Sequence, residues 1–270
     1  MLNRPTFDIT HSGHTFHCAG DRNFDLDRPM VCVTGARRAT PYGLALAEES
    51  GRILADTGHT LLTTAAMGCS VAAARAALDA GGEVVVMSAT GCNNPYPTTS
   101  RDVFERANLV MSLGGPDAPA TIIAFRARDA VIPDLVDSLV LCESGLRSGS
   151  LALADDVLEI GKSVFVYPGS VFSPTSEGCN GIIAHGGATM LTSTIHLANK
   201  LDRMSSRVTD VVRENDPFLA ALVATPMRAD DLARSLDAQP LDVLRKLAAY
   251  EVDGKVQRLP DGRYAHVPRP

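Results

Sequence analysis

Six short apolar runs recur along the first two-thirds of the chain, with segments of helical periodicity between and after them. Each run is almost continuously apolar, which is typical of a strand that is covered on both faces of a sheet. The expected strands span residues 30–34, 59–64, 83–88, 108–113, 138–142 and 163–167. The expected helices lie at 41–57, 70–80, 99–107, 119–130, 149–160 and 179–185. This alternation predicts an α/β fold with a doubly wound, mostly parallel sheet and right-handed crossovers.

The N-terminal segment has a different character from the region of the apolar runs. Residues 1–29 are expected to form an extension, in which Thr15–Cys18 could be a short edge strand. The doubly wound domain is expected over residues 30–201. Because ligands of such sheets bind outside the carboxyl ends of the strands, the loops after the strands are where a site is sought.

The pattern changes again near the C-terminus. Residues 202–215 are polar and charged, and they are expected to form a linker. Three short helical segments and a hairpin turning at Pro260–Gly262 then indicate a small winged-helix domain over 216–268. Its expected recognition helix offers only two basic residues, Arg245 and Lys246, so a protein-contact or autoregulatory role stays as open as a DNA-reading one.

Composition limits the class of protein further. The chain has 270 residues, of which 45% are hydrophobic, so a substantial core can form. No apolar run approaches the ~20 residues needed to span a bilayer, and six scattered cysteines without a C-x-x-C pair favour a reduced, cytoplasmic protein. The net charge of −6 argues against a protein that coats duplex DNA. Any nucleic-acid site must therefore be a local basic patch.

Two strand-to-helix turns have the features of a phosphate site. The strand at 138–142 leads to Gly145, and Ser148-Gly149-Ser150 then opens an apolar helix whose first backbone N–H groups can face an anion. After the first strand, Gly35 precedes Arg37 and Arg38, two guanidinium groups beside the next helix start. Solvated loop arginines are the simpler interpretation of this pair, but its coincidence with the serine turn favours binding.

Three motifs carry a family resemblance: Glu-Ser-Gly-Leu-Arg-Ser-Gly-Ser-Leu from Glu143, Tyr-Pro-Gly-Ser from Tyr167, and Gly178-x-Asn180-x-Ile-Ile-x-x-Gly-Gly-Ala. In this order and spacing they resemble the Rossmann-like domain of the DNA-processing protein A (DprA/Smf) family. The resemblance extends from about Thr15 to Leu201, and the C-terminal segment is similar to the winged helix of that family.

The resemblance implies a protein that binds single-stranded DNA, forms a homodimer and helps to load the RecA recombinase during natural transformation. It implies no enzymatic activity, no cofactor and no membrane association. The residues expected to bind DNA or phosphate lie in the two turns, in the segment near 125 and in the last motif. They are Gly35, Arg37, Arg38, Phe125, Arg126, Arg128, Ser148, Gly149, Ser150 and Asn180.

The chain also departs from the family pattern. Met67 stands where the family has an arginine, Ser70 where it has an aspartate, and Ala130 where it has a basic residue that Arg126 could replace. Phe125 could stack on a base, but packing as a buried helix residue is equally consistent with its type. Weaker DNA binding or a changed ligand is therefore open, and so is the loss of ligand binding in an interaction protein. The main alternative is a nucleotide-ligand sensor or a diverged nucleotide hydrolase that uses the same pocket.

No catalytic or metal-binding arrangement emerges from the sequence. The related phosphoribohydrolases need Pro-Gly-Gly-x-Gly-Thr-x-x-Glu at a strand-to-helix turn, and the turn at Glu143–Ser150 has no glutamate in the following helical turn. Glu143 is expected to accept hydrogen bonds from neighbouring backbone groups. His11, His14, His17 and Cys18 lie close together but match no structural zinc spacing. We therefore expect a binding protein without a metal.

Overall fold

The computed structural model covers the whole chain, and the structure describes Leu2, residues 4–204, Phe218, and residues 221–222, 226–252 and 255–266. These residues fall into two compact units, Met1–Val208 and Thr209–Pro270. The linker predicted at 202–215 lies mostly outside the described residues, so its ends stay a prediction.

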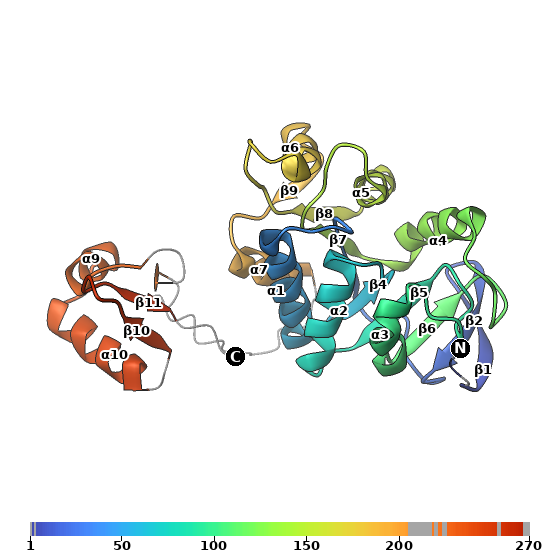
Figure 1. Ribbon diagram of the computed structural model, residues 1–270, viewed down its shortest axis with the longest axis horizontal. Helices are drawn as coiled ribbons and strands as arrows, with labels where there is room; N and C mark the ends of the chain where they lie inside the picture. Colours follow the sequence, from blue (N-terminus) through green and yellow to red (C-terminus); the bar gives the residue numbers. More distant parts are fainter. Residues whose placement is uncertain are drawn as a thin grey trace. The chain divides into compact units, whose positions relative to one another are not determined.

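The first unit is built on a nine-stranded sheet with the order β1-β2-β6-β5-β4-β3-β7-β8-β9 (Figure 1). Every neighbouring pair from β6 to β9 is parallel. These strands are β3 (Met30–Thr34), β4 (Thr60–Thr63), β5 (Val84–Ser88), β6 (Leu109–Ser112), β7 (Ser138–Leu141), β8 (Ser163–Val166) and β9 (Thr189–Met190). The α/β class and the doubly wound, mostly parallel sheet are therefore confirmed. Of these seven parallel strands, only β9, two residues long, has no apolar run from which to predict it.

The N-terminal segment, predicted as an extension, adds two strands to this sheet. Strands β1 (Thr6–His11) and β2 (His14–Gly20) form an antiparallel hairpin, and β2 pairs antiparallel with β6. The short strand expected at Thr15–Cys18 is longer and is not at the edge, because β1 covers it. Residues of β1 alternate between exposed and half-buried, so one face stays in solvent and the strand has no continuous apolar run.

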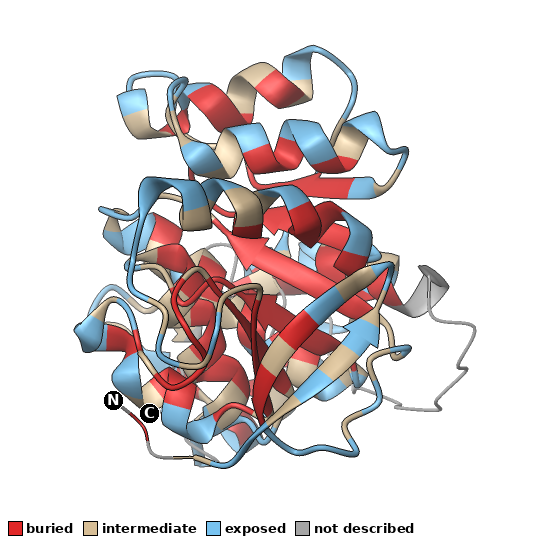
Figure 2. Ribbon diagram, turned by 90° about the vertical axis from the view of Figure 1, so that its right-hand side faces the viewer, coloured by how far each residue is buried: buried red, intermediate tan, exposed pale blue. Residues whose placement is uncertain are grey.

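Helices cover both faces of the sheet. Alternate residues of β3 point to opposite faces, so that Val31 and Val33 join one core while Met30 and Cys32 join the other. One face carries α1 (Pro41–Thr57), α2 (Cys69–Asp79), α3 (Arg101–Arg106) and α7 (Thr194–Met204). The opposite face carries α4 (Ile122–Leu135), α5 (Gly149–Glu159) and α6 (Glu177–Ala184). In Figure 2 the strands of the sheet are largely buried, and the helices show exposed outer faces.

Local sequence explains where the helices that follow β3 and β6 begin. Thr40 caps α1 by accepting a hydrogen bond from Gly43 N, and Pro41 occupies the first helical position. The helix predicted at 119–130 is displaced, because Thr121 caps α4 and the helix continues past Pro133 to bury a further apolar turn. Short 3₁₀ turns at η1 (Thr98–Ser100) and η2 (Pro174–Ser176) precede α3 and α6. Among the described residues, no helix has the length and apolar character needed to cross a membrane.

The second unit has its own small core. It contains α9 (Ala229–Ser235), α10 (Pro240–Val252) and the antiparallel pair β10 (Val256–Arg258) and β11 (Tyr264–His266). Leu232, Val243, Leu247 and Tyr250 are buried together there. The helices and the hairpin agree with the predicted winged helix. The first predicted helix of this domain lies mostly outside the described residues.

The close contact between α1 and α2 predicts that alanine substitution at two helical glycines has opposite effects on stability. A Cβ atom at Gly51 of α1 would lie 2.1 Å from the carbonyl oxygen of Ala73 in α2, whereas a Cβ at Gly181 of α6 meets no described atom within 4 Å. We expect Gly51→Ala to lower the free energy of unfolding of the sheet domain by about 1–3 kcal/mol through overpacking. Gly181→Ala, the matched control, should raise it by about 0.5–1 kcal/mol through helix propensity.

Urea unfolding followed by circular dichroism measures both changes. If Gly51→Ala is as stable as Gly181→Ala, then α1 and α2 do not pack with their backbones in contact.

Candidate functional site

The strand order reverses beside β3, because the chain passes from β3 to β4 on one side and later returns to β7 on the other. At this switch point, the loops that leave the carboxyl ends of neighbouring strands separate and open a crevice. A cavity of about 500 Å³ lies here, lined by the loops after β3, β4 and β7, by the start of α5 and by one turn of α4. Seven of the predicted site residues line it: Gly35, Arg37, Arg38, Arg128, Ser148, Gly149 and Ser150.

The loop between β3 and α1 supplies two exposed arginines, Arg37 and Arg38. The backbone of this loop is fixed, since Ala36 N donates to the carbonyl oxygen of Glu143 at 2.7 Å and Cys69 N donates to Ala36 O at 3.2 Å. Neither guanidinium group has a hydrogen-bond or ion-pair partner among the described residues. Two cations are thus held at the cavity without a protein anion to neutralise them.

The serine turn after β7 lies against the same cavity. Ser148 caps α5 by accepting a hydrogen bond from Leu151 N at 3.1 Å. Its hydroxyl oxygen lies 2.5 Å from that of Ser144 and 3.1 Å from that of Ser150, so the three hydroxyl groups form one network. Gly149 is exposed, and a Cβ there would meet no described atom, which leaves the first N–H groups of α5 accessible from the cavity. Hydroxyl and N–H donors at a helix N-terminus suit an anionic ligand.

Helix α4 contributes Arg128 to the cavity lining, and the positive charge of this residue is compensated by Asp129. Arg128 is only 5% exposed, and its Nε and Nη2 donate to one carboxylate oxygen of Asp129 at 2.9 and 2.6 Å. The guanidinium group also lies over the ring of Phe125, 5.2 Å from its centroid. Phe125 itself packs edge-on against Tyr96 and does not line the cavity. Exposed Arg126 does not line it either.

Asn180, the remaining predicted residue, also lies outside the cavity. Its side-chain amide bonds both backbone groups of Gly169: Gly169 N donates to Oδ1 and Nδ2 donates to Gly169 O, each at 3.1 Å. Asn180 therefore fixes the Pro-Gly turn after β8. Sequence reasoning could not anticipate this, because the partner of an amide depends on the fold and not on the motif.

Several residues of the cavity lining were not predicted. The most important is Arg147, which is exposed beside Ser148 and has no ion-pair partner among the described residues. Because Arg147 directly precedes Ser148 in the sequence, its place in the cavity lining could have been predicted. Ser70, where the family has an aspartate, lines the cavity, whereas Met67 and Ala130 do not. The lining holds four arginines and one aspartate, Asp129.

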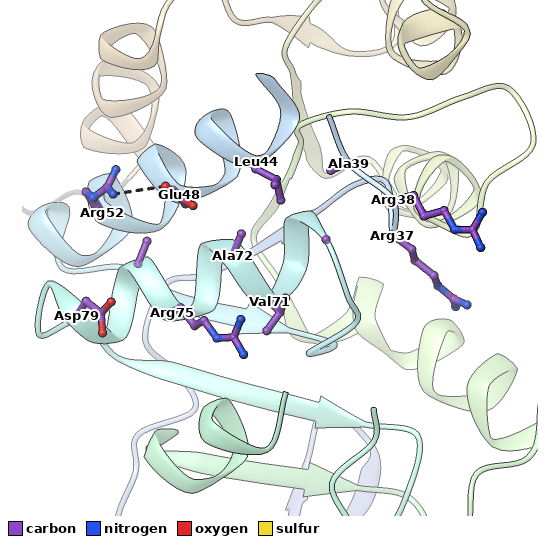
Figure 3. A pocket seen from close by; sticks show the side chains of 12 residues that line it. Arg37, Arg38, Ala39, Leu44, Glu48, Arg52, Val71, Ala72, Arg75 and Asp79 are labelled. Atoms are coloured by element: carbon purple, nitrogen blue, oxygen red, sulfur yellow. Dashed lines mark ion pairs between the residues drawn. The ribbon is translucent and has the colours of Figure 1, made fainter. Parts of the chain in front are cut away.

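A second groove of about 560 Å³ runs between α1 and α2 and shares Arg37 and Arg38 (Figure 3). In Figure 3 these two side chains project from the loop, away from Glu48, Arg52 and Asp79 at the other end of the groove. There the positive charge is compensated, because Arg52 pairs with Glu48 at 3.6 Å. Uncompensated arginine is thus concentrated at the end shared with the first cavity.

Glu143 holds the two halves of the site together. It is 3% exposed, and its Oε2 accepts hydrogen bonds from Thr40 N at 2.8 Å and Thr40 Oγ1 at 3.2 Å. This is the acceptor role expected from the sequence. A carboxylate at the N-terminus of α1 is also favoured by the helix dipole.

The thiols and imidazoles offer no additional chemistry in the part of the chain that the structure describes. All six cysteines are free and buried. Burial raises the pKa of Cys18, Cys32, Cys69 and Cys179 to about 12. The described residues contain no group of three side chains able to hold a metal ion. His17 bonds Asp8 and His14 bonds Asp134 instead.

Comparison with known proteins identifies the family. Residues 6–202, more than half of the chain, match the family described as DNA recombination-mediator protein A. The chain belongs to this family. Residues 210–262 match the DprA winged helix domain, in agreement with the resemblance drawn from the motifs.

Relatives in three bacteria are similar to this DprA-family chain. The DNA processing protein DprA of Streptococcus pneumoniae is 32% identical over 175 residues, a match that covers 63% of this chain and 61% of that protein. Protein Smf of Escherichia coli is 27% identical over 266 residues, which cover 89% of this chain and 70% of Smf. The solved structure of DNA processing protein A from Helicobacter pylori has a TM-score of 0.68 at 25% identity, covering 75% of this chain and 97% of that one. That structure is described in terms of its single-stranded DNA binding mode.

The buried thiols predict a loss of stability at alkaline pH. Above the ordinary thiol pKa of about 9, cysteines of the unfolded chain ionise while those with a native pKa of about 12 stay protonated. The free energy of unfolding should therefore be unaffected below pH 9 and fall between pH 9 and 12, by about 1.4 kcal/mol per pH unit for each such thiol. Urea midpoints at several pH values measure this fall. Cys32→Ala should make it shallower, and an unchanged slope would contradict the assignment to buried thiols.

Proposed function

We propose that this DprA-family protein binds single-stranded DNA in the cavity at the β3–β7 switch point, and that it acts in DNA uptake during transformation. The observation that carries the proposal is the pair Arg37 and Arg38. Both residues line the cavity, and neither guanidinium group has an anionic partner among the described residues. The N-terminus of α5 and the serine hydroxyls line the same space, so these donors converge where a phosphate group would sit.

Charge and size favour a single strand over a duplex. The whole chain carries a net charge of −6, so attraction of a polyanion requires a local basic patch such as this one. A cavity of about 500 Å³ is the size of a pocket for a small ligand, and it can hold a few phosphate and sugar groups of a flexible strand. The H. pylori relative, described by its single-stranded DNA binding mode, adds support. Because the matched region spans 61% of the S. pneumoniae protein, the activity of that whole protein enters here as a proposal.

We place the main DNA contact in the sheet domain and not in the winged helix. In α10, Arg245 pairs with Asp242 at 3.6 Å, and the Lys246 ammonium lies over the ring of Phe218, 4.2 Å from its centroid. The two basic residues of the expected recognition helix are therefore already engaged.

We infer that the protein acts by binding and not by catalysis. The cavity lining contains no histidine or lysine that could activate a serine, and its single carboxylate, Asp129, is bonded to Arg128. The serine hydroxyls bond one another. The alternative, a nucleotide sensor or a diverged hydrolase, would use the same donors for one small ligand, and affinity measurements separate the two.

The arginine pair predicts the effect of a single substitution. Arg37→Ala should weaken binding of a fluorescent oligo-dT by about 1.5–3 kcal/mol, the range for a hydrogen bond to a charged group. Arg245→Ala in the winged helix and Arg52→Ala at the far end of the α1–α2 groove should have far smaller effects. Fluorescence anisotropy titrations of the three variants measure this, and circular dichroism checks their folding.

An unchanged affinity of Arg37→Ala would show that the cavity is not the DNA site. A larger loss for Arg245→Ala would place the strand on the winged helix, and a larger loss for Arg52→Ala would place it in the groove.

Salt dependence provides a second test. If Arg37, Arg38 and Arg147 each neutralise one phosphate, the logarithm of the affinity should fall with the logarithm of salt concentration with a slope of about −2, roughly 0.7 for each contact. Oligonucleotides should also bind more tightly than mononucleotides. A mononucleotide that binds equally well, with no salt slope, would instead establish the sensor.

We further infer, from the family alone, that the protein forms a homodimer in the cytoplasm and loads RecA onto bound strands. The six buried free thiols are compatible with a reducing compartment. Light scattering at micromolar concentration should give twice the monomer mass of 28.5 kDa. A monomer would remove the dimer and weaken the RecA-loading role with it.

A further inference from the structure

A separate cavity of about 430 Å³ is lined by Thr40, and neither Arg37 nor Arg38 lines it. Its walls include Tyr42, Pro168, Gly169 and Ser170, and Glu143 also lines it. Tyr42 is 51% exposed, and its hydroxyl donates to Pro168 O at 2.7 Å, which holds the ring against the Pro-Gly turn. The loops after β3 and β7 line both cavities, so the two sites are a few residues apart along the same segments.

Glu143 presents an unused acceptor to this second cavity. Thr40 donates twice to Oε2, but no described residue donates to Oε1. Gly43 provides room for the carboxylate, because a Cβ there would lie 2.0 Å from Oε2. A carboxylate that is 3% exposed and still has an open oxygen at a cavity wall calls for a hydrogen-bond donor from a ligand.

The chemistry of the walls selects the ligand. A buried carboxylate repels phosphate, so the second cavity is not an extension of the phosphate site. The Tyr42 ring and Pro168 offer apolar surface, and Ser170 Oγ accepts from Phe172 N, which leaves its own proton for a ligand oxygen. A flat, partly apolar group with N–H donors and a carbonyl oxygen on one edge fits these walls.

We propose that this second cavity receives one nucleobase of the bound strand and that Glu143 favours guanine over thymine there. Guanine presents two adjacent donors, N1–H and the N2 amino group, together with its O6 acceptor. Thymine presents a single N3–H between two carbonyl oxygens, which a carboxylate repels. The inference rests on the proposed function, since the phosphates of the same strand would occupy the arginine cavity.

The first test changes only the ligand. Twelve-residue oligo-dT is compared with the same oligonucleotide carrying one central dG, and with one carrying deoxyinosine, which lacks the N2 amino group. We expect the dG strand to bind about tenfold more tightly than oligo-dT, the effect of roughly one hydrogen bond to a charged group, and the inosine strand to lose most of that gain. Equal affinities for the three strands would overturn the proposal.

The second test changes Glu143. In Glu143→Gln, the amide oxygen should stay with the Thr40 N–H donor, which turns the NH₂ group towards the cavity. An NH₂ donor suits the carbonyl oxygens of thymine, so the preference for dG should disappear or reverse. Glu177→Gln, at an exposed position of α6 outside both cavity linings, removes the same charge and should keep the preference for dG.

These outcomes separate the two proposals. If all three strands bind equally and Arg37→Ala weakens all of them, the phosphate site stands and the base site falls. If no strand binds even at low salt, the proposed function fails and the base site fails with it. A dG preference that Glu143→Gln leaves intact would assign base selection to other residues and overturn the role of Glu143.

Discussion

One buried carboxylate residue fixes the loop on which the site depends. Glu143 follows β7, and its main-chain oxygen accepts from Ala36 N while its side chain accepts from Thr40 N. These two bonds lie at the two ends of the loop that carries Arg37 and Arg38. Two long, exposed side chains therefore start from a rigid backbone, which would reduce the entropy lost in the proposed binding of a phosphate group. Removing this carboxylate would also leave the partly buried Thr40 N–H without its acceptor.

The same residue explains why one strand end separates two chemically different cavities. In the first cavity, arginines and helix N–H groups create a positive potential. In the second, the open oxygen of Glu143 creates a negative one in a wall that also contains the Tyr42 ring. A nucleotide has both characters, an anionic phosphate and a base with N–H donors, so a strand could satisfy both cavities at once. A small inorganic anion could satisfy only the first.

Much of the sheet domain could be predicted because burial on both faces leaves a plain signal. The central strands are continuous apolar runs, and the caps Thr40 and Ser148 mark where two helices begin. Strand β1 was missed because one of its faces is in solvent. In the site, the predicted residues in loops after strands line the cavity. Phe125, Arg126 and Asn180 do not line it, because the direction of a helical side chain and the partner of an amide are set by packing that the sequence does not display.

The remaining arginines explain how a chain of net negative charge can present a positive site. Away from the cavity, several arginines of the sheet domain are paired with carboxylates: Arg28 with Glu83, Arg75 with Asp102, and Arg106 with Asp79. Each pair cancels its own field within a few ångströms, so it contributes little at a distance. Arg37 and Arg38 are not cancelled by any described residue. The positive potential at the cavity therefore depends less on how many arginines the chain has than on where arginines without a carboxylate partner gather, as Arg37, Arg38 and Arg147 do, and this can be seen only once the chain is folded.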